Sequence, residues 1–225
     1  MLWKKKLLAD CKLYLILDTE VNDYDSLFEI AREAVISGVD ILQLRDKSGL
    51  PADILKFSRR ILPVIRSAAV RRKKQILFIM NDRVDLAIAS GASGVHIGQD
   101  DLPLPWVRKM MGTKAVIGVS CQNLKQAQLA QRQGADYIGF GSIFKTKTKP
   151  QRNPMDFDLL HRVFKKIKIP VFAIGGIDQN NVILLKDRGV DRVAVCRAIS
   201  QTQRISHTVR TFREILDRTW VRKQD

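Results

Sequence analysis

Short apolar runs recur eight times along this chain, and each is followed by a segment with helical spacing of its apolar residues. Most runs are rich in Leu, Ile and Val and do not alternate polar with apolar residues, which is typical of parallel strands covered on both faces. The strands expected from these runs are residues 13–17, 41–44, 75–80, 94–97, 115–119, 137–140, 170–174 and 192–196.

The segments between the runs predict eight helices, several of which end at a glycine. In residues 26–37 the apolar residues recur at helical spacing, and Gly38 follows as a C-terminal cap signal. Pro63 is expected to kink the longest helix. The expected helices are residues 26–37, 52–74, 84–90, 104–111, 124–133, 157–166, 181–188 and 207–222.

Eight strand–helix units in strict alternation within 225 residues favour a (β/α)8 TIM barrel over an open, doubly wound sheet. The connections are mostly short, and no linker or low-complexity segment interrupts the pattern. We therefore expect a single α/β domain over residues 1–225, with a core of about residues 13–200 and a C-terminal helix of about residues 207–222.

Polar residues gather where the expected strands end, and in a barrel these ends converge on the face that carries the active site. Asp82 and Asp101 follow neighbouring strands, so their carboxylates can share one Mg²⁺, which binds one or two carboxylates together with phosphate oxygens. Other residues at these ends are Arg45, Lys47, Asn81, Asp100, Ser120, Thr146, Thr148, Lys149, Gly175 and Gly176.

Cationic and small residues at the same face indicate a phosphorylated ligand. Arg45, Lys47 and Lys149 supply positively charged donors for a pyrophosphate. Gly175 and Gly176 allow the backbone to approach a ligand closely, next to the helix N-terminus that often holds a phosphate in this fold. The pattern predicts a site for a diphosphate and its metal beside a second phosphate.

Each of these residues also has a structural explanation. Asn81 and Asp82, like Asp100 and Asp101, could cap the helices that follow them, and Ser120 could be a turn residue. Lysines and an arginine beside acids at one rim favour the functional interpretation, with Asp101 as a metal ligand and Asp100 in a supporting or capping role.

No Ser–His or Cys–His pair suggests a protein nucleophile. One histidine lies inside an expected strand and two lie on expected helices, so we interpret all three as structural: His96, His161 and His207. The three cysteines have no metal-ligand spacing, and we expect reduced thiols in a cytoplasmic protein: Cys11, Cys121 and Cys196.

The formal net charge of +16 is the unusual bulk property of this chain. A strongly basic protein can bind nucleic acid, an anionic membrane surface or phosphorylated substrates. Most basic clusters fall on expected helices or at their ends, where a solvated face explains them, whereas residues 145–152 lie in a loop. No apolar run is long enough to span a membrane, and the N-terminus lacks the apolar core of a signal peptide.

Six short motifs follow one another at barrel positions that match a known family. They are Gln43-Leu44-Arg45-Asp46-Lys47, Asn81-Asp82, Val95-His96-Ile97-Gly98-Gln99-Asp100-Asp101, Gly118-Val119-Ser120, Thr146-Lys147-Thr148-Lys149 and Ala173-Ile174-Gly175-Gly176-Ile177. Each motif alone is weak, but six in order are specific. With them the chain resembles the thiamine-phosphate synthase family, from Tyr14 to about Ser200.

The resemblance implies a transferase that joins 4-amino-2-methyl-5-hydroxymethylpyrimidine diphosphate to a thiazole phosphate, giving thiamine phosphate and pyrophosphate. It implies that Mg²⁺ bridges the diphosphate to Asp82 and Asp101. It also implies a dissociative substitution, in which positioning and charge stabilisation replace a protein nucleophile. The catalytic residues are then expected to be Arg45, Lys47, Ser120 and Lys149.

The resemblance further implies which residues hold each substrate. Those matching the pyrimidine diphosphate site are Gln43, Arg45, Lys47, Asn81, Ser120 and Lys149. Those matching the thiazole phosphate site are Thr146, Thr148, Gly176, Cys196 and Arg197. Leu44, Asp46 and Lys147 belong to the same motifs and are counted with the substrate-binding residues.

The chain departs from the family pattern at three places, and their effect on activity or thiazole preference stays open. Cys121-Gln122-Asn123 stands where a small residue and His-Ser or His-Thr are usual, and Ser142 and Lys145 replace two prolines. Cys196-Arg197 stands where the family usually has an apolar residue and Ser, and we expect Arg197 to pair with the thiazole phosphate.

Three alternatives fit the residues less well. A thiazole tautomerase-like relative typically has a histidine where this chain has Gln122, and it lacks the paired acids. An inactive barrel that binds nucleic acid through its basic surface would have no reason to keep the acids Asp82 and Asp101 close to the cation Lys47. A phosphosugar isomerase or epimerase would need an acid–base pair instead of a metal–diphosphate set. The expected partners are therefore small molecules, without membrane or nucleic acid, and a homo-oligomer stays open.

Overall fold

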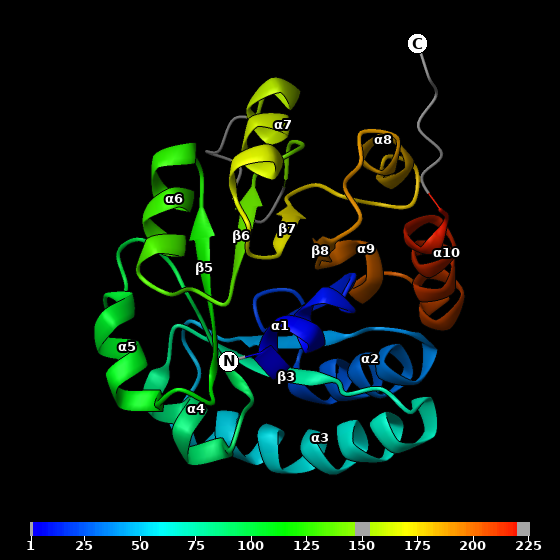
Figure 1. Ribbon diagram of the computed structural model, residues 1–225. Coiled ribbons are helices and arrows are strands. Elements are labelled where there is room, and N and C mark those ends of the chain that lie inside the picture. The colour runs from blue at the N-terminus through cyan, green and yellow to red at the C-terminus, as the bar shows by residue number, and fades with distance from the viewer. Residues whose placement is uncertain (1, 147–153, 220–225) are drawn as a thin grey trace.

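Eight parallel strands close into a barrel in the computed structural model, which describes residues 2–146 and 154–219 (Figure 1). Each strand pairs with the next in the chain, and β8 pairs with β1 to close the ring. The strands are β1 (Leu13–Asp18), β2 (Ile41–Arg45), β3 (Leu77–Asn81), β4 (Gly94–Ile97), β5 (Val116–Cys121), β6 (Tyr137–Gly141), β7 (Val171–Ile174) and β8 (Val193–Val195). The predicted (β/α)8 barrel is confirmed.

All eight predicted helices are present, and together they surround the barrel (Figure 1). The longest continues through Pro63, and the last ends at Asp217, earlier than predicted, because no glycine or proline in the sequence marks that end. The helices are α2 (Tyr24–Ser37), α3 (Pro51–Arg72), α4 (Val84–Ser90), α5 (Leu104–Met111), α6 (Leu124–Arg132), α7 (Phe157–Lys166), α8 (Val182–Lys186) and α10 (Ile205–Asp217). Two short helices, α1 (Leu2–Ala9) and α9 (Arg197–Ser200), were not predicted.

Local sequence signals set the ends of α2. The Asp23 side chain accepts a hydrogen bond from the backbone N–H of Ser26 at 2.8 Å, which satisfies a free N–H at the start of the helix. Gly38 ends the helix with φ of +141°, and its N–H bonds the carbonyl of Ala34. The apolar stripe between these caps, which includes Leu27, is buried against the barrel.

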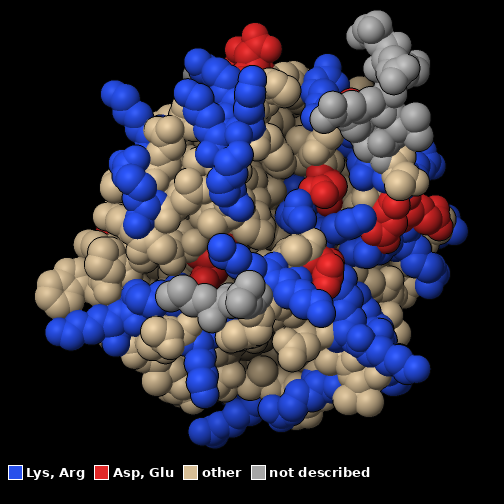
Figure 2. Space-filling view, viewed as in Figure 1, with Lys and Arg blue, Asp and Glu red and all other residues tan. Residues whose placement is uncertain are grey.

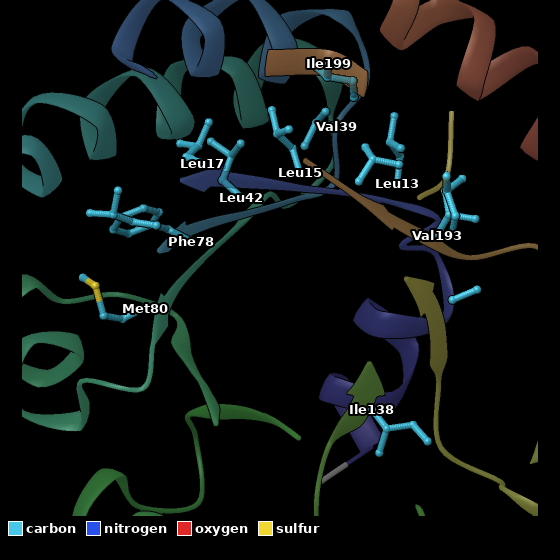
Figure 3. Close-up of a cluster of buried hydrophobic side chains, with 14 of the residues drawn as sticks. Leu13, Leu15, Leu17, Val39, Leu42, Phe78, Met80, Ile138, Val193 and Ile199 are labelled. Atoms are coloured by element: carbon cyan, nitrogen blue, oxygen red, sulfur yellow. The ribbon is translucent and has the colours of Figure 1, made fainter. Parts of the chain in front are cut away.

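One hydrophobic layer lies between the strands and the helices. Figure 3 shows Leu13, Leu15, Leu17 and Leu42 pointing from their strands toward the surrounding helices, and all four side chains are fully buried. Since alternate residues of a strand point to opposite sides, the residues between them face the barrel interior. Burial on both sides explains why the strands read as continuous apolar runs.

A second, smaller cluster fills the inside of the barrel. It contains Tyr14, Tyr137 and Phe172 from three strands, and Leu8 of α1 packs against it. Lys4 of α1 donates to the carbonyl of Ala115 and pairs with a neighbouring aspartate, and α1 lies across the barrel in Figure 1. The helix therefore closes the end of the barrel at which the strands begin, and leaves the opposite end open.

Figure 2 views the molecule from the side of α1 and shows lysine and arginine side chains spread over that face. Within residues 2–146 and 154–219, no helix is long and apolar enough to cross a membrane.

Candidate functional site

A cavity of about 460 Å³ opens over the C-terminal ends of the strands. Its wall is built from inward-facing residues of the strands and from the loops that follow them, because the short strand–helix connections bring these positions to one rim. Eight of the expected site residues line it: Gln43, Arg45, Asn81, Ser120, Thr146, Gly176, Cys196 and Arg197.

A smaller cavity of about 180 Å³ adjoins the larger one. The two share three lining residues, Arg45, Asn81 and Ser120. The smaller cavity is lined mainly by polar and charged residues and holds four more of the charged residues expected at this rim: Lys47, Asp82, Asp100 and Asp101. The site therefore has a large compartment with apolar walls and a small compartment with charged walls, joined at the shared residues.

Two carboxylates face one another in the smaller cavity. Asp82 and Asp101 lie within hydrogen-bonding reach, and Lys47 forms an ion pair with Asp82. Burial and the hydrogen bond with Asp82 raise the pKa of Asp101 above its ordinary value. Asp82 holds its backbone at φ of +58°, in the left-handed region that few residues other than glycine adopt. Such local strain clusters at functional sites.

Gly98 makes room for the Asp101 carboxylate. Its backbone N–H donates to Oδ2 of Asp101 at 2.6 Å, and a Cβ at Gly98 would lie 2.9 Å from that oxygen. A side chain at this position would push the carboxylate away, so the Gly98 in the sequence fixes where Asp101 points.

Helix capping does not explain these acids. Helix α4 begins after Arg83 and α5 begins after Pro103, and neither helix has a side-chain hydrogen bond at its N-cap. The capping alternative for Asp82 and Asp101, and the capping role considered for Asp100, are therefore wrong. Asp100 is exposed at the rim.

Arg45 is held by acids from the end of β1. Its guanidinium lies 2.7 Å from Oδ1 of Asp18 and 3.1 Å from Oε2 of Glu20. Asp18 Oδ2 and Asn81 Nδ2 are buried and have no hydrogen-bond partner among the described residues. Both residues line the larger cavity, so these unsatisfied polar atoms lie directly behind its wall.

Two residues have to be removed from the predicted binding set. The side chain of Leu44 is fully buried in the layer between the strands and the helices, because it points outward between Gln43 and Arg45. Asp46 organises its own loop: it accepts hydrogen bonds from the N–H groups of Ser48 and Gly49 and from the Tyr24 hydroxyl. Burial acts to raise the pKa of Asp46, but these hydrogen bonds outweigh it and hold the pKa below its ordinary value.

Three more expected residues, Lys147, Thr148 and Lys149, lie outside the described residues. The departures from the family pattern do reach the site. Gln122 lines the smaller cavity, and Lys145 and Arg197 line the larger one.

The interpretation of His96 as purely structural missed its position in the cavity wall. His96 lies 2.9 Å from the Ser120 hydroxyl through Nε2 and 3.0 Å from the Tyr137 hydroxyl through Nδ1. Tyr14 and Tyr137 line the cavity as well and were also missed. The available signal was the strand alternation, which places Tyr14 and His96 on the same inward side as Gln43 and Ser120.

The cysteines are free, as predicted. Burial raises the pKa of the Cys11, Cys121 and Cys196 thiols to about 12 in each case. Cys196 lines the larger cavity as a neutral thiol, so it is not an activated nucleophile.

The donor set fits a metal that needs few protein ligands. In the part of the chain that the structure describes, no three His, Cys, Asp or Glu side chains are grouped to hold a metal ion. Mg²⁺ does not require such a group, because it usually keeps waters and binds one or two carboxylates with substrate phosphates. The facing carboxylates of Asp82 and Asp101 meet that requirement.

Comparison with known proteins gives concordant matches. A family model described as thiamine monophosphate synthase matches residues 13–199. The thiamine-phosphate synthase of Halalkalibacterium halodurans is 38% identical over 211 residues, which cover 93% of this chain and 97% of that protein. That of Coprothermobacter proteolyticus is 36% identical, with 96% of this chain and all of that protein covered. The solved thiamine phosphate pyrophosphorylase from Pyrococcus furiosus superimposes with a TM-score of 0.82 at 30% identity, covering 96% and 98% of the two chains.

A closed parallel barrel with charged and polar side chains converging over the ends of its strands is a (β/α)8-barrel enzyme. The matches span nearly the whole barrel and include its rim. The chain belongs to the thiamine-phosphate synthase family.

Proposed function

We propose that this chain joins 4-amino-2-methyl-5-hydroxymethylpyrimidine diphosphate to a thiazole phosphate and releases pyrophosphate. The observation that carries the proposal is the pair of joined cavities. The small one offers a lysine and facing carboxylates to a diphosphate, and the large one offers apolar walls to two rings. Relatives named thiamine-phosphate synthase at 36–38% identity support it.

In this proposal Asp82 and Asp101 hold Mg²⁺, and Arg45, Lys47 and Lys149 bind the diphosphate. The metal supplies positive charge that stabilises the departing diphosphate. Arg45 is oriented for this role by Asp18 and Glu20. Asn81 brings an unsatisfied amide N–H group to the place where the two cavities meet.

The larger cavity holds the two rings. Gln43 and Ser120 contact the pyrimidine diphosphate, and Thr146, Gly176, Cys196 and Arg197 surround the thiazole phosphate. Lys147 and Thr148 belong to the same substrate-binding loop.

The reaction is a substitution at the methylene carbon of the pyrimidine. The carbon–oxygen bond to the diphosphate breaks, and its electron pair leaves with the diphosphate. The lone pair of the thiazole nitrogen then forms the new carbon–nitrogen bond. No protein nucleophile takes part, which agrees with the buried, neutral thiols. The chain contributes positioning and charge stabilisation. We place the reaction in the cytoplasm, supported by three free cysteines.

Pyrophosphate release tests the proposal. Mixing both substrates with Mg²⁺ and the protein should release pyrophosphate, and EDTA should abolish the release. Asp101→Ala should remove Mg²⁺-dependent turnover, whereas Asp100→Ala, at the exposed neighbour, should keep a substantial part of it. A protein that releases no pyrophosphate from the two substrates, or equal losses in the two variants, would contradict the assignment.

A further inference from the structure

The segment that follows β7, residues 175–178, forms part of the wall of the larger cavity. The loop after β6 packs directly on it, and the backbone N–H of Phe144 donates to the carbonyl of Gly175 at 2.9 Å. A Cβ at Gly176 would lie 2.3 Å from the carbonyl oxygen of Lys145, so only glycine allows the two loops to lie this close. The loop after β6 therefore fixes the path of this backbone on one side.

Asn181 fixes the same segment on another side. Its Nδ2 donates to the carbonyl oxygen of Gly176 at 2.8 Å, and its Oδ1 accepts from the backbone N–H of Asp178 at 2.9 Å. Because one end of the amide faces an acceptor and the other end faces a donor, the orientation of the amide is determined. Asn181 lines neither cavity, so the carbonyl of Gly176 points away from the cavity.

The Asn181 side chain does not do what its position in the chain predicts. It occupies the N-cap position of α8, where an asparagine side chain usually accepts a hydrogen bond from an N–H of the first helical turn. Among the described residues no side-chain hydrogen bond caps α8, and the amide is turned toward the preceding loop instead. Departures from such local rules are typical of functional sites. Asn181 therefore serves the loop and not the helix.

The orientation of one peptide group follows from this contact. The peptide between Gly176 and Ile177 is trans, so its C=O and N–H groups point in opposite directions. With the carbonyl held by Asn181, the N–H of Ile177 is directed toward the cavity. The side chain of Ile177 is buried in the layer between strands and helices, yet the residue lines the cavity, which means that its backbone faces the cavity. In the part of the chain that the structure describes, this N–H donates to no other residue.

We propose that Asn181 is a positioning residue of the cavity: it holds the Gly176 carbonyl and thereby presents the N–H of Ile177 to the phosphate of the thiazole substrate. The identity of the ligand rests on the proposed function, whereas the orientation of the peptide does not. A backbone N–H that is held in place is a suitable donor for an anion, because hydrogen bonds to ionised acceptors are stronger than those between neutral groups.

Steady-state kinetics of Asn181→Asp test the proposal. Aspartate keeps the acceptor for the N–H of Asp178 but replaces the donor with a carboxylate oxygen, which repels the carbonyl of Gly176. We expect the KM for the thiazole phosphate to rise about 10-fold or more, since hydrogen bonds to charged groups have effects of this order. The KM for the pyrimidine diphosphate should stay within about twofold, because Asn181 does not act on that substrate.

The matched control is Asn180→Asp, which adds the same charge one residue away. The Asn180 side chain is exposed and forms no hydrogen bond to another described residue. This variant should leave both KM values within about twofold of the wild type. Equal increases in the two variants, or an equal rise for both substrates in Asn181→Asp, would show an effect of charge or of general structure and would overturn the proposal.

A titration with inorganic phosphate tests the orientation of the peptide without either substrate. In two-dimensional ¹H–¹⁵N NMR of the backbone amides, phosphate should shift the Ile177 signal to saturation in the wild type and in Asn180→Asp, and this response should be lost in Asn181→Asp. A wild-type Ile177 signal that phosphate leaves unchanged, or an equal shift in Asn181→Asp, would overturn the proposal. A wild type that responds to phosphate at Ile177 but releases no pyrophosphate would refute the proposed function and leave the role of Asn181 standing.

Discussion

Asp40 holds together the closed end of the barrel, and its replacement by asparagine is the most informative stability test. Its carboxylate is fully buried and receives five donors. Two are the backbone N–H groups at the start of β1, and three are the side chains of Arg72, Lys74 and Arg213, at 3.2, 2.7 and 2.8 Å. The residue therefore joins α3, α10 and the first strand.

The Asp40→Asn substitution would remove the charge and put an NH₂ group among donors. Breaking a buried ion pair by removing one partner costs about 3–5 kcal/mol, because the remaining charges stay buried without compensation. Asparagine keeps one acceptor oxygen, and Lys74 is 25% exposed, so the lower end of that range applies. We expect the free energy of unfolding to fall by about 3 kcal/mol, which for a chain of this length lowers Tm by roughly 6–12 °C.

Urea denaturation followed by circular dichroism measures the free energy of unfolding of Asp40→Asn. The matched control is Asp217→Asn, which removes a carboxylate that pairs with Lys12 and Arg213 but is 44% exposed. Because exposed ion pairs contribute little, the control should lose less than about 1 kcal/mol. Equal losses in the two variants, or a loss below about 1 kcal/mol for Asp40→Asn, would refute the reasoning.

Three further predictions concern the interior and the site. Burial raises the pKa of the Cys11, Cys121 and Cys196 thiols to about 12, so they should react slowly with a disulfide reagent at pH 8 in the folded protein and rapidly in urea. A thiol that reacts fast in the folded protein would contradict this. Gly118→Ala should lower the free energy of unfolding by about 1–3 kcal/mol through overpacking against Tyr137, measured by urea denaturation, and a neutral effect would mean that the ring can move away. Arg197→Ala should raise the KM for the thiazole phosphate more than that for the pyrimidine diphosphate in steady-state kinetics; equal effects would remove Arg197 from the thiazole phosphate site.

The barrel could be predicted from the sequence because its strands are buried on both sides. Continuous apolar runs such as Leu13–Asp18 are typical of parallel strands that are buried on both faces. Glycines such as Gly38 mark the ends of the helices between them. The helix α1 could not be found in this way. Its apolar residues do not form a regular stripe, and only contact with the barrel interior through Leu8 explains its place.

Strand alternation explains most of what the sequence interpretation missed in the site. Leu44 was predicted to contact the ligand because the motif that contains it and Gln43 was treated as one unit. Neighbouring residues of a strand point to opposite sides, so only Gln43 faces the cavity. The same alternation puts Tyr14 and Tyr137 inside the barrel. From the sequence alone, a tyrosine at such a position is interpreted as a residue of the hydrophobic core. Their polar role depends on which strands lie side by side, because each hydroxyl bonds a residue distant in the chain.

The net charge of +16 is not by itself evidence for a phosphorylated ligand, because many of the cations lie away from the cavity. At the cavity, Arg45 and Lys47 are each paired with acids. Some of the exposed cations that form no ion pair with another described residue lie on α1 and at the ends of α3 and α7, where each helix leads into the start of a strand. These are Lys5, Lys6, Arg71, Lys73, Lys165, Lys166 and Lys168. Figure 2 shows the face on which α1 lies. Lysine and arginine stabilise helix C-termini by interaction with the helix dipole, which accounts for the residues that follow α3 and α7. Cations at the closed end of the barrel do not reach the cavity, so the case for a phosphorylated ligand depends on the cations at the rim, which among the described residues are Arg45, Lys47, Lys145 and Arg197.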